Sequence, residues 1–433
     1  MDVRARREGL RAVGADIKKV LGRVNTHDDN PLDLQADPQP AEQGIDWLSR
    51  PRPDTNRVDT ASCRSVMGLA ISAALDSALI AIDAAMPAQP TNQQRLIRAK
   101  CRGLLRGYDV KWSDSPYIPL SIEEVLVADL PNINTKGTSR TFEIAGKVDL
   151  IARYNEKTVL FDHKTASASY DIQDPNAPYW RQLAVEGQVT HYYLLLWLLG
   201  RKVDGAVWNV IKKPSINPRK LTKLERDGVI SKGSWFGDPV PDETRTAIAN
   251  GEDRETFYMY ESRLAHDCTI ERSERYFQRR QVPRFNQEIF DYARELWQHS
   301  QDMLYARHGM PTTNEAFKHF PRNSGACLLY NSPCRYLGIC SGYDKPDSDR
   351  WARREWVHQE LPVLDVDSEV LTNSRIRCFQ TCRRKEFFDY QMGLERFDEE
   401  EKESLWFGSL WHIGQAAWWE KVYDRDRSDG GFL

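Results

Sequence analysis

The stretch that decides the fold is residues 146–164, GKVDLIARYNEKTVLFDHK. Apolar residues alternate with polar ones on both sides of the turn Tyr154-Asn155-Glu156-Lys157, which predicts two strands joined as a β-hairpin. Asp149 lies near the middle of the first strand and Asp162 at the end of the second, so pairing of the strands brings two carboxylates together. Lys164 follows Asp162 by two positions, and the period of a strand sends both side chains to one face.

Two carboxylates and a lysine suit metal-assisted cleavage of a phosphodiester. Carboxylate oxygens are the ligands that a hard cation such as Mg²⁺ prefers. The lysine orients the attacking water or stabilises the charge that develops on the phosphoryl group. A surface hairpin with solvated charges also explains these residues, so the motif by itself leaves both interpretations open.

The next segment, Arg181 to Leu199, has the length and the apolar content of a helix. Gln188 and Tyr192 are four positions apart in it, so they share one helix face. A helix that only packs an aromatic ring against the sheet explains Tyr192, but it does not explain the order and spacing of the whole set.

This set, Asp149, Asp162-x-Lys164 and Gln188-x-x-x-Tyr192, resembles the RecB-like branch of the PD-(D/E)XK nuclease superfamily. The resemblance implies an α/β fold with a restriction-endonuclease-like core, in which helices flank a central mixed β-sheet, and additional helical regions. It implies that Asp149 and Asp162 bind Mg²⁺ or Mn²⁺ and that Lys164 is catalytic. It also implies that Gln188 and Tyr192 contact the substrate strand.

The composition is that of a soluble protein with a large core. The chain has 433 residues, 40% of them hydrophobic, and 13 tryptophans, which allows two or three subdomains. Its most apolar stretch, Val66 to Met86, contains Asp76 and Asp83, so no membrane span is predicted. The first ten residues lack the apolar segment of a signal peptide, so we expect a cytoplasmic location. Because the net charge is -3, contact with nucleic acid requires local basic patches.

The N-terminal segment is predicted to contain a basic helix and a linker. Residues 2–24 carry arginines and lysines around apolar residues at helical spacing, which are Leu10, Val13, Ile17, Leu21 and Val24. Such a helix contacts DNA or a partner, or it is a solvated helix docked on the body. Residues 25–60 are rich in Pro, Asp, Asn and Gln, which is typical of a linker or a long loop.

The patterns along the rest of the body predict further helices over 63–86, 92–112 and 284–307, and strands over 121–130 and 205–212. Glu123 and Glu124 place an acidic residue of the first of these strands near the predicted metal, although paired glutamates are more often exposed. Residues 213–255 are predicted to form a polar loop. Its basic residues form a candidate phosphate-contact patch, which consists of Lys212, Lys213, Arg219, Lys220 and Lys223.

Three cysteines, Cys327, Cys334 and Cys340, lie in the stretch FPRNSGACLLYNSPCRYLGIC. Disulfides are rare in cytosolic chains, and the CxxC pairs typical of structural zinc are absent. The residues alone leave open an iron-sulfur cluster, a zinc ion or unliganded thiols. Many RecB-like nucleases hold a [4Fe-4S] cluster with three C-terminal cysteines and one distant N-terminal cysteine, so the resemblance implies such a cluster here.

The remaining ligands implied by the resemblance lie near the C-terminus. In the family, a helix with a cysteine followed by basic and aromatic residues opens the nuclease domain, and the next helix carries a Gly-x-x-x-His motif whose histidine binds metal. The matching motifs here are Cys382-Arg383-Arg384-Lys385 and Gly408-x-x-x-His412. The resemblance therefore implies that Cys382 completes the cluster, with Cys378 as a competitor. It also implies that His412 and the backbone carbonyl of His163 complete the metal site.

The order of these motifs is permuted relative to the family. The chain is either a circular permutant that completes its own site or a fragment of a tandem array, and a third arrangement swaps the tail between subunits. The presence of one copy of each motif favours completion within the chain. We expect a basic helix and linker over 1–60, a nuclease body with the hairpin and the cysteine segment over 61–360, and the permuted opening helices over 361–433.

The predicted function is a metal-dependent DNA nuclease, and specifically an exonuclease that acts in recombination, repair or phage replication. Tyr179-Trp180, the Gln188-x-x-x-Tyr192 motif and the cysteine segment look most like those of nucleases encoded by bacteriophages. The expected partners are DNA ends and a helicase or recombination protein. The alternative is a catalytically inactive DNA-binding or scaffold module with a structural iron-sulfur cluster.

Overall fold

The computed structural model describes residues 72–135, 137–308, 316–329, 332–366, 368–397 and 403–428. The helix predicted at 2–24 and the linker predicted at 25–60 lie outside these residues. Among the described residues, no helix combines the length and the hydropathy that crossing a bilayer requires.

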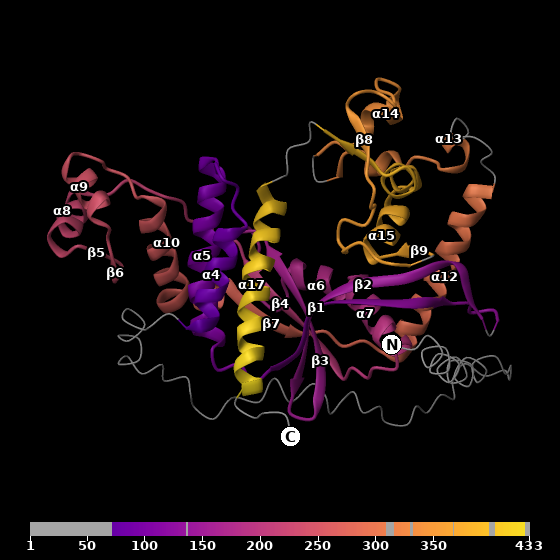
Figure 1. The fold of residues 1–433 in the computed structure, drawn as a ribbon, viewed down its shortest axis with the longest axis horizontal. Coiled ribbons are helices and arrows are strands. Elements are labelled where there is room, and N and C mark those ends of the chain that lie inside the picture. The colour runs from indigo at the N-terminus through magenta and orange to yellow at the C-terminus, as the bar shows by residue number, and fades with distance from the viewer. Residues whose placement is uncertain are drawn as a thin grey trace.

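A mixed β-sheet forms the centre of the α/β fold (Figure 1), in the predicted arrangement. Its strand order is β1 (Ile118–Pro131), β2 (Thr138–Tyr154), β3 (Lys157–Ala166), β4 (Gly205–Lys212) and β7 (Phe277–Gln281). β3 and β4 are parallel, and the other neighbours on this path are antiparallel. We call residues 361–433 the tail. It contributes a short sixth strand, β9 (Glu369–Leu371), which pairs in parallel with β2.

β2 and β3 form the predicted hairpin. Tyr154 lies opposite Lys157, and Asn155 adopts a left-handed conformation with φ of 52°, which asparagine tolerates better than most residues. The pairing runs as far as Leu150 and Phe161 and then stops. Beyond that point β9 pairs with residues 142–144 of β2. The two strands therefore separate next to Asp149 and Asp162.

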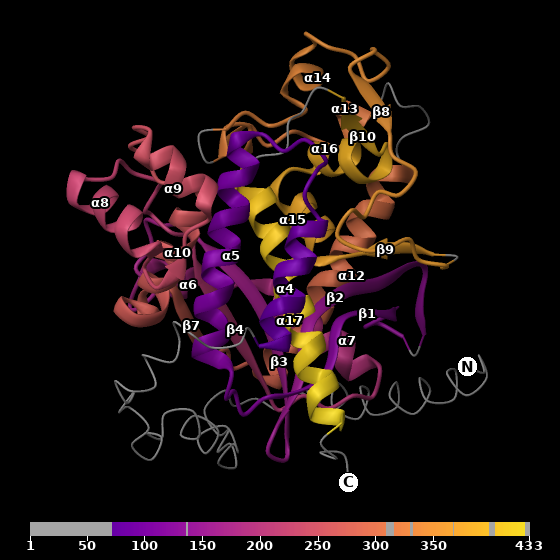
Figure 2. The ribbon, with the colours of Figure 1, turned by 60° about the vertical axis from the view of Figure 1, so that its left-hand side comes forward.

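Helices cover both faces of the sheet (Figure 2). One face packs against α6 (Pro178–Ala184), α7 (Gly187–Leu198) and α12 (Asn286–His308). The other face packs against α4 (Ala73–Ala84), α5 (Asn92–Trp112), α10 (Phe257–His266) and α17 (Glu403–Ser428). Neighbouring residues of β3 divide between the two cores, because Leu160 belongs to the first and Phe161 to the second.

Two expected elements, the helix over 92–112 and the strand over 205–212, have the predicted bounds. The helix expected over 284–307 is α12, and the strand expected over 121–130 is the longer β1. Of the helix expected over 63–86, residues 63–71 lie outside the described residues. The described part contains α4, and the Ser72 side chain caps its start by accepting a hydrogen bond from the Leu75 N–H.

The single helix expected over 181–199 is wrong, because the chain forms α6 and α7 with a break at Val185 and Glu186. Val185 is 84% exposed, so nothing apolar holds it in a continuous helix. The Glu186 carbonyl accepts a hydrogen bond from Arg284 Nη2 at 3.0 Å, and its carboxylate pairs with Arg377. These contacts replace helical hydrogen bonds at the break.

The polar loop expected over 213–255 is also wrong, because this segment folds into a small lobe. It contains α8 (Lys223–Lys232), β5 (Ser234–Trp235), β6 (Asp238–Pro239) and α9 (Asp242–Ala249). The lobe has an apolar cluster of its own, which consists of Leu221, Val229, Trp235, Val240, Ile248 and Met259. Within the predicted basic patch, Arg219 pairs with Glu225, Lys220 pairs with Asp253, and Lys212 is buried.

The remaining elements follow α10 in the chain and extend into the tail. They are η1 (Asp267–Glu271), α11 (Ser273–Tyr276), α13 (Ala316–His319), η3 (Ser324–Ala326), α14 (Leu337–Ser341), β8 (Trp351–Arg353), α15 (Asn373–Thr381), α16 (Arg383–Glu386), η5 (Phe387–Gln391) and β10 (Leu394–Arg396). β8 pairs with β10 beside an apolar cluster that includes Phe320, Tyr336 and Phe388. We call residues 316–366 and 382–397 the cysteine lobe, since they contain four of the cysteines.

The tail returns to the body through α17, which lies against α4 and α5 (Figures 1 and 2). Trp411, Trp418 and Trp419 are buried in this contact. Trp418 Nε1 donates to Asp109 Oδ1 at 2.7 Å, and the Ser72 hydroxyl donates to the same oxygen at 2.8 Å. One carboxylate therefore joins α17 to the start of α4.

Candidate active site

The two aspartates of the hairpin lie where β2 and β3 separate. Asp149 Oδ2 accepts a hydrogen bond from the backbone N–H of His163 at 2.6 Å. Asp162 is 1% exposed, and its Oδ1 has no hydrogen-bond partner among the described residues. Lys164 Nζ lies 2.8 Å from Asp162 Oδ2 as an ion pair. We call the point where β2 and β3 separate the fork. Buried carboxylate oxygens at the fork therefore lack part of their possible hydrogen bonds.

His412 of α17 reaches this fork from the tail. Its Nδ1 lies 4.0 Å from Asp149 Oδ1. Glu123, Asp149 and His412 each offer a ligand atom, and these atoms all lie within 4.8 Å of one another. Asp162 is not a member of this group, although its carboxylate acts electrostatically on His412. Three distant parts of the chain therefore converge on one position.

Glu123 is the member that sequence patterns do not identify, since they do not distinguish it from Glu124. In the structure, Ile122 pairs with Leu150 and Glu124 with Val148, so Glu123 lies across from Asp149. Its φ of 50° is unusual for a residue other than glycine, and such conformations concentrate at functional sites. Glu124 instead forms an ion pair with Arg201.

Lys164, Gln188 and Tyr192 form a hydrogen-bonded chain beside the carboxylates. Lys164 Nζ donates to Gln188 Oε1, and Gln188 Nε2 donates to the Tyr192 hydroxyl at 2.8 Å. Tyr192 is 5% exposed. A Cβ at Gly146 would lie 2.8 Å from the Tyr192 ring, so the absence of a side chain at this position of β2 leaves room for the ring. The helix spacing of Gln188 and Tyr192 thus sets the position of the lysine.

Burial controls the electrostatics of the site. It raises the pKa of Asp149 to about 7, and the nearby Glu123 adds to the increase. Burial also raises the pKa of Asp162 to about 7, against the opposing effect of Lys164. Burial lowers the pKa of His412. A neutral imidazole and several carboxylates with incomplete partners are a donor set that fits a hard divalent cation such as Mg²⁺ or Mn²⁺.

A buried polar network fixes the side chain of His163 behind the site. Arg279 Nε, which can only donate, donates to Asn209 Oδ1 at 3.2 Å. The Asn209 amide nitrogen therefore faces Tyr108 and His163 Nδ1, at 3.1 and 3.0 Å. His163 Nδ1 is then an acceptor, so a neutral ring carries its proton on Nε2. The side chain of His163 thus serves the network, whereas its backbone faces Asp149.

A groove of about 860 Å³ opens over the converging residues. It runs between β2, the start of α7, the start of α15 and α17. Its lining includes Glu123, Lys147, Asp149, Gln188, Tyr192, Asn373, Ser409 and His412. Lys147 Nζ lies 2.5 Å from Glu123 Oε2. The groove gives an extended substrate access to the fork.

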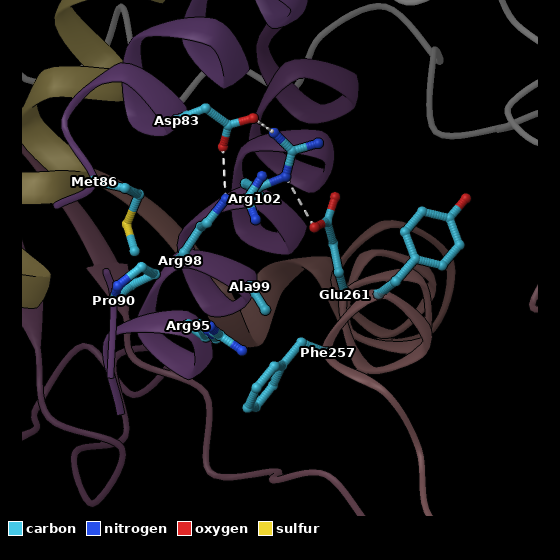
Figure 3. A pocket seen from close by; sticks show the side chains of 10 residues that line it. Asp83, Met86, Pro90, Arg95, Arg98, Ala99, Arg102, Phe257 and Glu261 are labelled. Carbon is cyan, nitrogen blue, oxygen red and sulfur yellow. Dashed lines mark hydrogen bonds and ion pairs between the residues drawn. The ribbon is translucent and has the colours of Figure 1, made fainter. Parts of the chain in front are cut away.

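A second pocket, of about 400 Å³, lies between α4, α5 and α10 (Figure 3). Arg102 bridges Asp83 and Glu261 in it, and Arg98 also pairs with Asp83. The pocket shares no lining residue with the groove. Its ion pairs join three helices, and we assign it no role in catalysis.

The four predicted cluster ligands lie in the cysteine lobe. Burial raises the pKa of Cys340 to about 11, and the thiols of Cys334, Cys382 and Cys327 contribute. No three of these thiols lie within 4.8 Å of one another among the described residues, whereas a zinc ion with Zn–S bonds of about 2.3 Å requires such proximity. Cys378 is 8% exposed, and burial raises the pKa of its thiol, an effect to which the Cys382 thiol adds.

The comparison with protein families covers the hairpin and the helix that follows it. The family model described as "PD-(D/E)XK nuclease superfamily" matches residues 58–341, which is more than half of the chain. Neither the curated proteins nor the solved structures contain a match. The matched region contains both aspartates, the lysine and the Gln188-x-x-x-Tyr192 motif. The chain therefore belongs to the PD-(D/E)XK nuclease superfamily.

Proposed function

We propose that this protein is a DNA exonuclease of the RecB-like branch, with a metal site completed by its own tail. The proposed ligands of Mg²⁺ or Mn²⁺ are Asp149, Asp162, His412, the backbone carbonyl of His163 and Glu123. The observation that carries the proposal is the convergence of Glu123, Asp149 and His412 within 4.8 Å. When bound, the cation polarises a phosphoryl oxygen and lowers the pKa of a water molecule.

The residues of the chain position the reacting groups in this proposal. Lys164 is the catalytic lysine, and its ammonium donates to a phosphoryl oxygen or to the attacking water. Gln188 accepts from Lys164 and so holds the ammonium at the fork, while Tyr192 holds Gln188. Both residues also line the groove, where they contact the substrate strand.

The proposed biological role is the processing of DNA ends in recombination, repair or phage replication. A helicase or recombination protein is the proposed partner, because such an enzyme supplies or uses the processed ends. The resemblance to RecB-like nucleases of the phage type supports this role.

The proposal is tested by incubating linear single-stranded and double-stranded DNA with Mg²⁺ or Mn²⁺. We expect the wild type to degrade the DNA and Asp162→Ala to lose at least about a hundredfold in rate, since a metal ligand is removed. Asp114→Ala, a change of an exposed aspartate in the loop after α5, is the matched control and should keep full activity. Closed circular DNA should resist an exonuclease.

Two results contradict the proposal. Equal degradation by the wild type and Asp162→Ala rejects the assigned site. No degradation by the wild type with either metal favours the alternative of an inactive DNA-binding module, provided that the DNA still binds.

We also propose that Cys327, Cys334, Cys340 and Cys382 hold a [4Fe-4S] cluster in the cysteine lobe. Thiolates are the usual ligands of such clusters, and the mutual influence of these thiols supports their proximity. Anaerobically purified protein should be brown and contain about four iron atoms per chain. Cys382→Ala should lose the visible absorbance, whereas Cys378→Ala should retain it. A colourless wild type, or loss only in Cys378→Ala, contradicts this assignment.

A further inference from the structure

Two tyrosine rings pack against each other on the side of the sheet that α6 covers. Tyr170 belongs to the loop between β3 and α6, and Tyr179 belongs to α6. Their ring centroids are 4.9 Å apart and their planes are inclined by 32°. Tyr179 is 8% exposed, whereas Tyr170 is 38% exposed. The buried ring therefore supports a second ring that faces solvent.

The tyrosine pair is close to the cleavage residues. After burial, the Asp162 carboxylate is the largest cause that raises the pKa of Tyr179. The period of β3 places Lys164 on the same face as Asp162, and Lys212 lies on that face opposite Ala166. Neither tyrosine lines the groove bounded by α17. Tyr179 thus lies on the face of the sheet that carries Asp162, outside that groove.

The loop that carries Tyr170 is fixed in position. Trp180 Nε1 donates to the Ile172 carbonyl at 3.0 Å. Arg280 Nη2 donates to the carbonyls of Ile172 and Gln173, and its guanidinium lies 4.1 Å from the Trp180 ring centroid. Preorganisation of this kind lowers the entropic cost of binding a ligand. The ring of Tyr170 is therefore ordered before a ligand binds.

The loop that carries Tyr170 contains two acidic residues, and each accepts a local hydrogen bond. Asp171 accepts a hydrogen bond from the Gln173 N–H at 3.0 Å, and Asp174 accepts one from the Asn176 N–H at 2.8 Å. The Lys212 ammonium acts electrostatically with Asp171. The Lys212 ammonium therefore partly offsets the negative charge of Asp171.

We propose that Tyr170, supported by Tyr179, stacks on an unpaired nucleobase next to the cleaved phosphate, so that the strand in the site is single-stranded. This inference rests on the proposed nuclease function. Bases inside a duplex are covered by their neighbours, so only a base freed from the helix offers its face to a side chain. Every base has such a face, so stacking tolerates any sequence.

The test compares steady-state degradation of single-stranded and blunt double-stranded oligonucleotides in Mg²⁺. Removal of one stacking ring weakens single-strand binding by about tenfold. We therefore expect Tyr170→Ala to raise KM for the single strand by about tenfold, with kcat within about twofold of wild type. Tyr170→Phe keeps the ring and should behave as wild type. Tyr343→Ala removes a tyrosine that is 92% exposed in the cysteine lobe, and it is the matched control.

The outcomes separate this inference from the proposed function. If Asp162→Ala degrades DNA as fast as wild type, the proposed function fails. If Asp162→Ala is inactive but Tyr170→Ala leaves KM for the single strand unchanged, only the stacking inference fails. An equal rise of KM on blunt duplex, or failure of Tyr170→Phe to restore KM, also overturns it. Unchanged thermal unfolding of Tyr170→Ala confirms that the variant is folded.

Discussion

At the scale of single residues, the two buried carboxylates make the site sensitive to pH. The pKa values of Asp149 and Asp162 are raised to about 7, and unfolded aspartates titrate near about 3.9. The folded state therefore binds protons more tightly than the unfolded state in this range. The free energy of unfolding of the metal-free protein accordingly loses a contribution as the pH rises from about 4 to about 7.

This titration predicts a pH-dependent response to metal. Ligand carboxylates must be deprotonated to bind a cation, so we expect Mg²⁺ to raise Tm little at about pH 5.5 and increasingly up to about pH 8. Thermal unfolding with and without Mg²⁺ measures this response. Asp162→Asn removes one titrating group and should flatten the decline of metal-free stability with pH. An Mg²⁺ response of equal size at both pH values contradicts the prediction.

Local spacing was enough to predict most residues of the fork. Asp162 and Lys164 share a strand face, and Gln188 and Tyr192 share a helix turn, so short-range geometry determines both pairs. Glu123 depends instead on the register between β1 and β2 and on an unusual φ. Neither property is visible in the alternation of apolar and polar residues. Sequence patterns therefore do not predict the position of Glu123, because it depends on the long-range pairing of strands.

At the scale of elements, α17 depends on a close approach at Gly414. A Cβ at this position would lie 2.8 Å from Leu105 Cδ1 and 2.9 Å from Ile82 Cδ1. We expect Gly414→Ala to destabilise the protein by about 1–3 kcal/mol, the usual cost of overpacking. It should also reduce the increase in Tm caused by Mg²⁺, because α17 carries His412. Chemical denaturation and thermal unfolding measure the two effects.

Gly228 provides the matched control. It lies in α8, and a Cβ there meets no atom within 4 Å, so Gly228→Ala should stabilise the protein by about 0.5–1 kcal/mol through helix propensity. If both substitutions stabilise the protein, the packing of α17 on α4 and α5 is looser than described.

The elements that sequence patterns missed owe their form to tertiary contacts. The break between α6 and α7 depends on Arg284 and Arg377, which are distant in sequence from Glu186. The lobe over 220–259 has polar helices that bury few residues each, such as Val229 in α8 and Ile248 in α9. A weak apolar pattern of this kind resembles a loop in the sequence.

At the scale of the whole molecule, the body and the tail form one structure. Besides α17, the strand β9 pairs with β2, and Arg307 of α12 forms an ion pair with Glu369 of β9. The order of the family motifs indicated that the tail completes the body. The strand β9 was not expected, because three residues carry no periodic signal.

Reordering of the chain tests this arrangement. Trp418 and Ser72 bind one oxygen of Asp109, and the ten residues of α17 after Trp418 cover about 15 Å. A flexible linker of about ten residues spans this distance. We expect a chain ordered 368–428, linker, 72–366 to fold with a Tm within about 5 °C of residues 72–428 in native order, and to keep the Mg²⁺ response. An unfolded product contradicts the proposed circular permutation.

The late position of His412 has a consequence for synthesis. The imidazole follows both aspartates by about 250 residues, so a ribosome makes every other proposed ligand long before this one. A nascent chain, or a product of premature termination before α17, lacks the complete metal site. Under the proposed function, the cell is therefore exposed to the nuclease activity only after translation has passed α17.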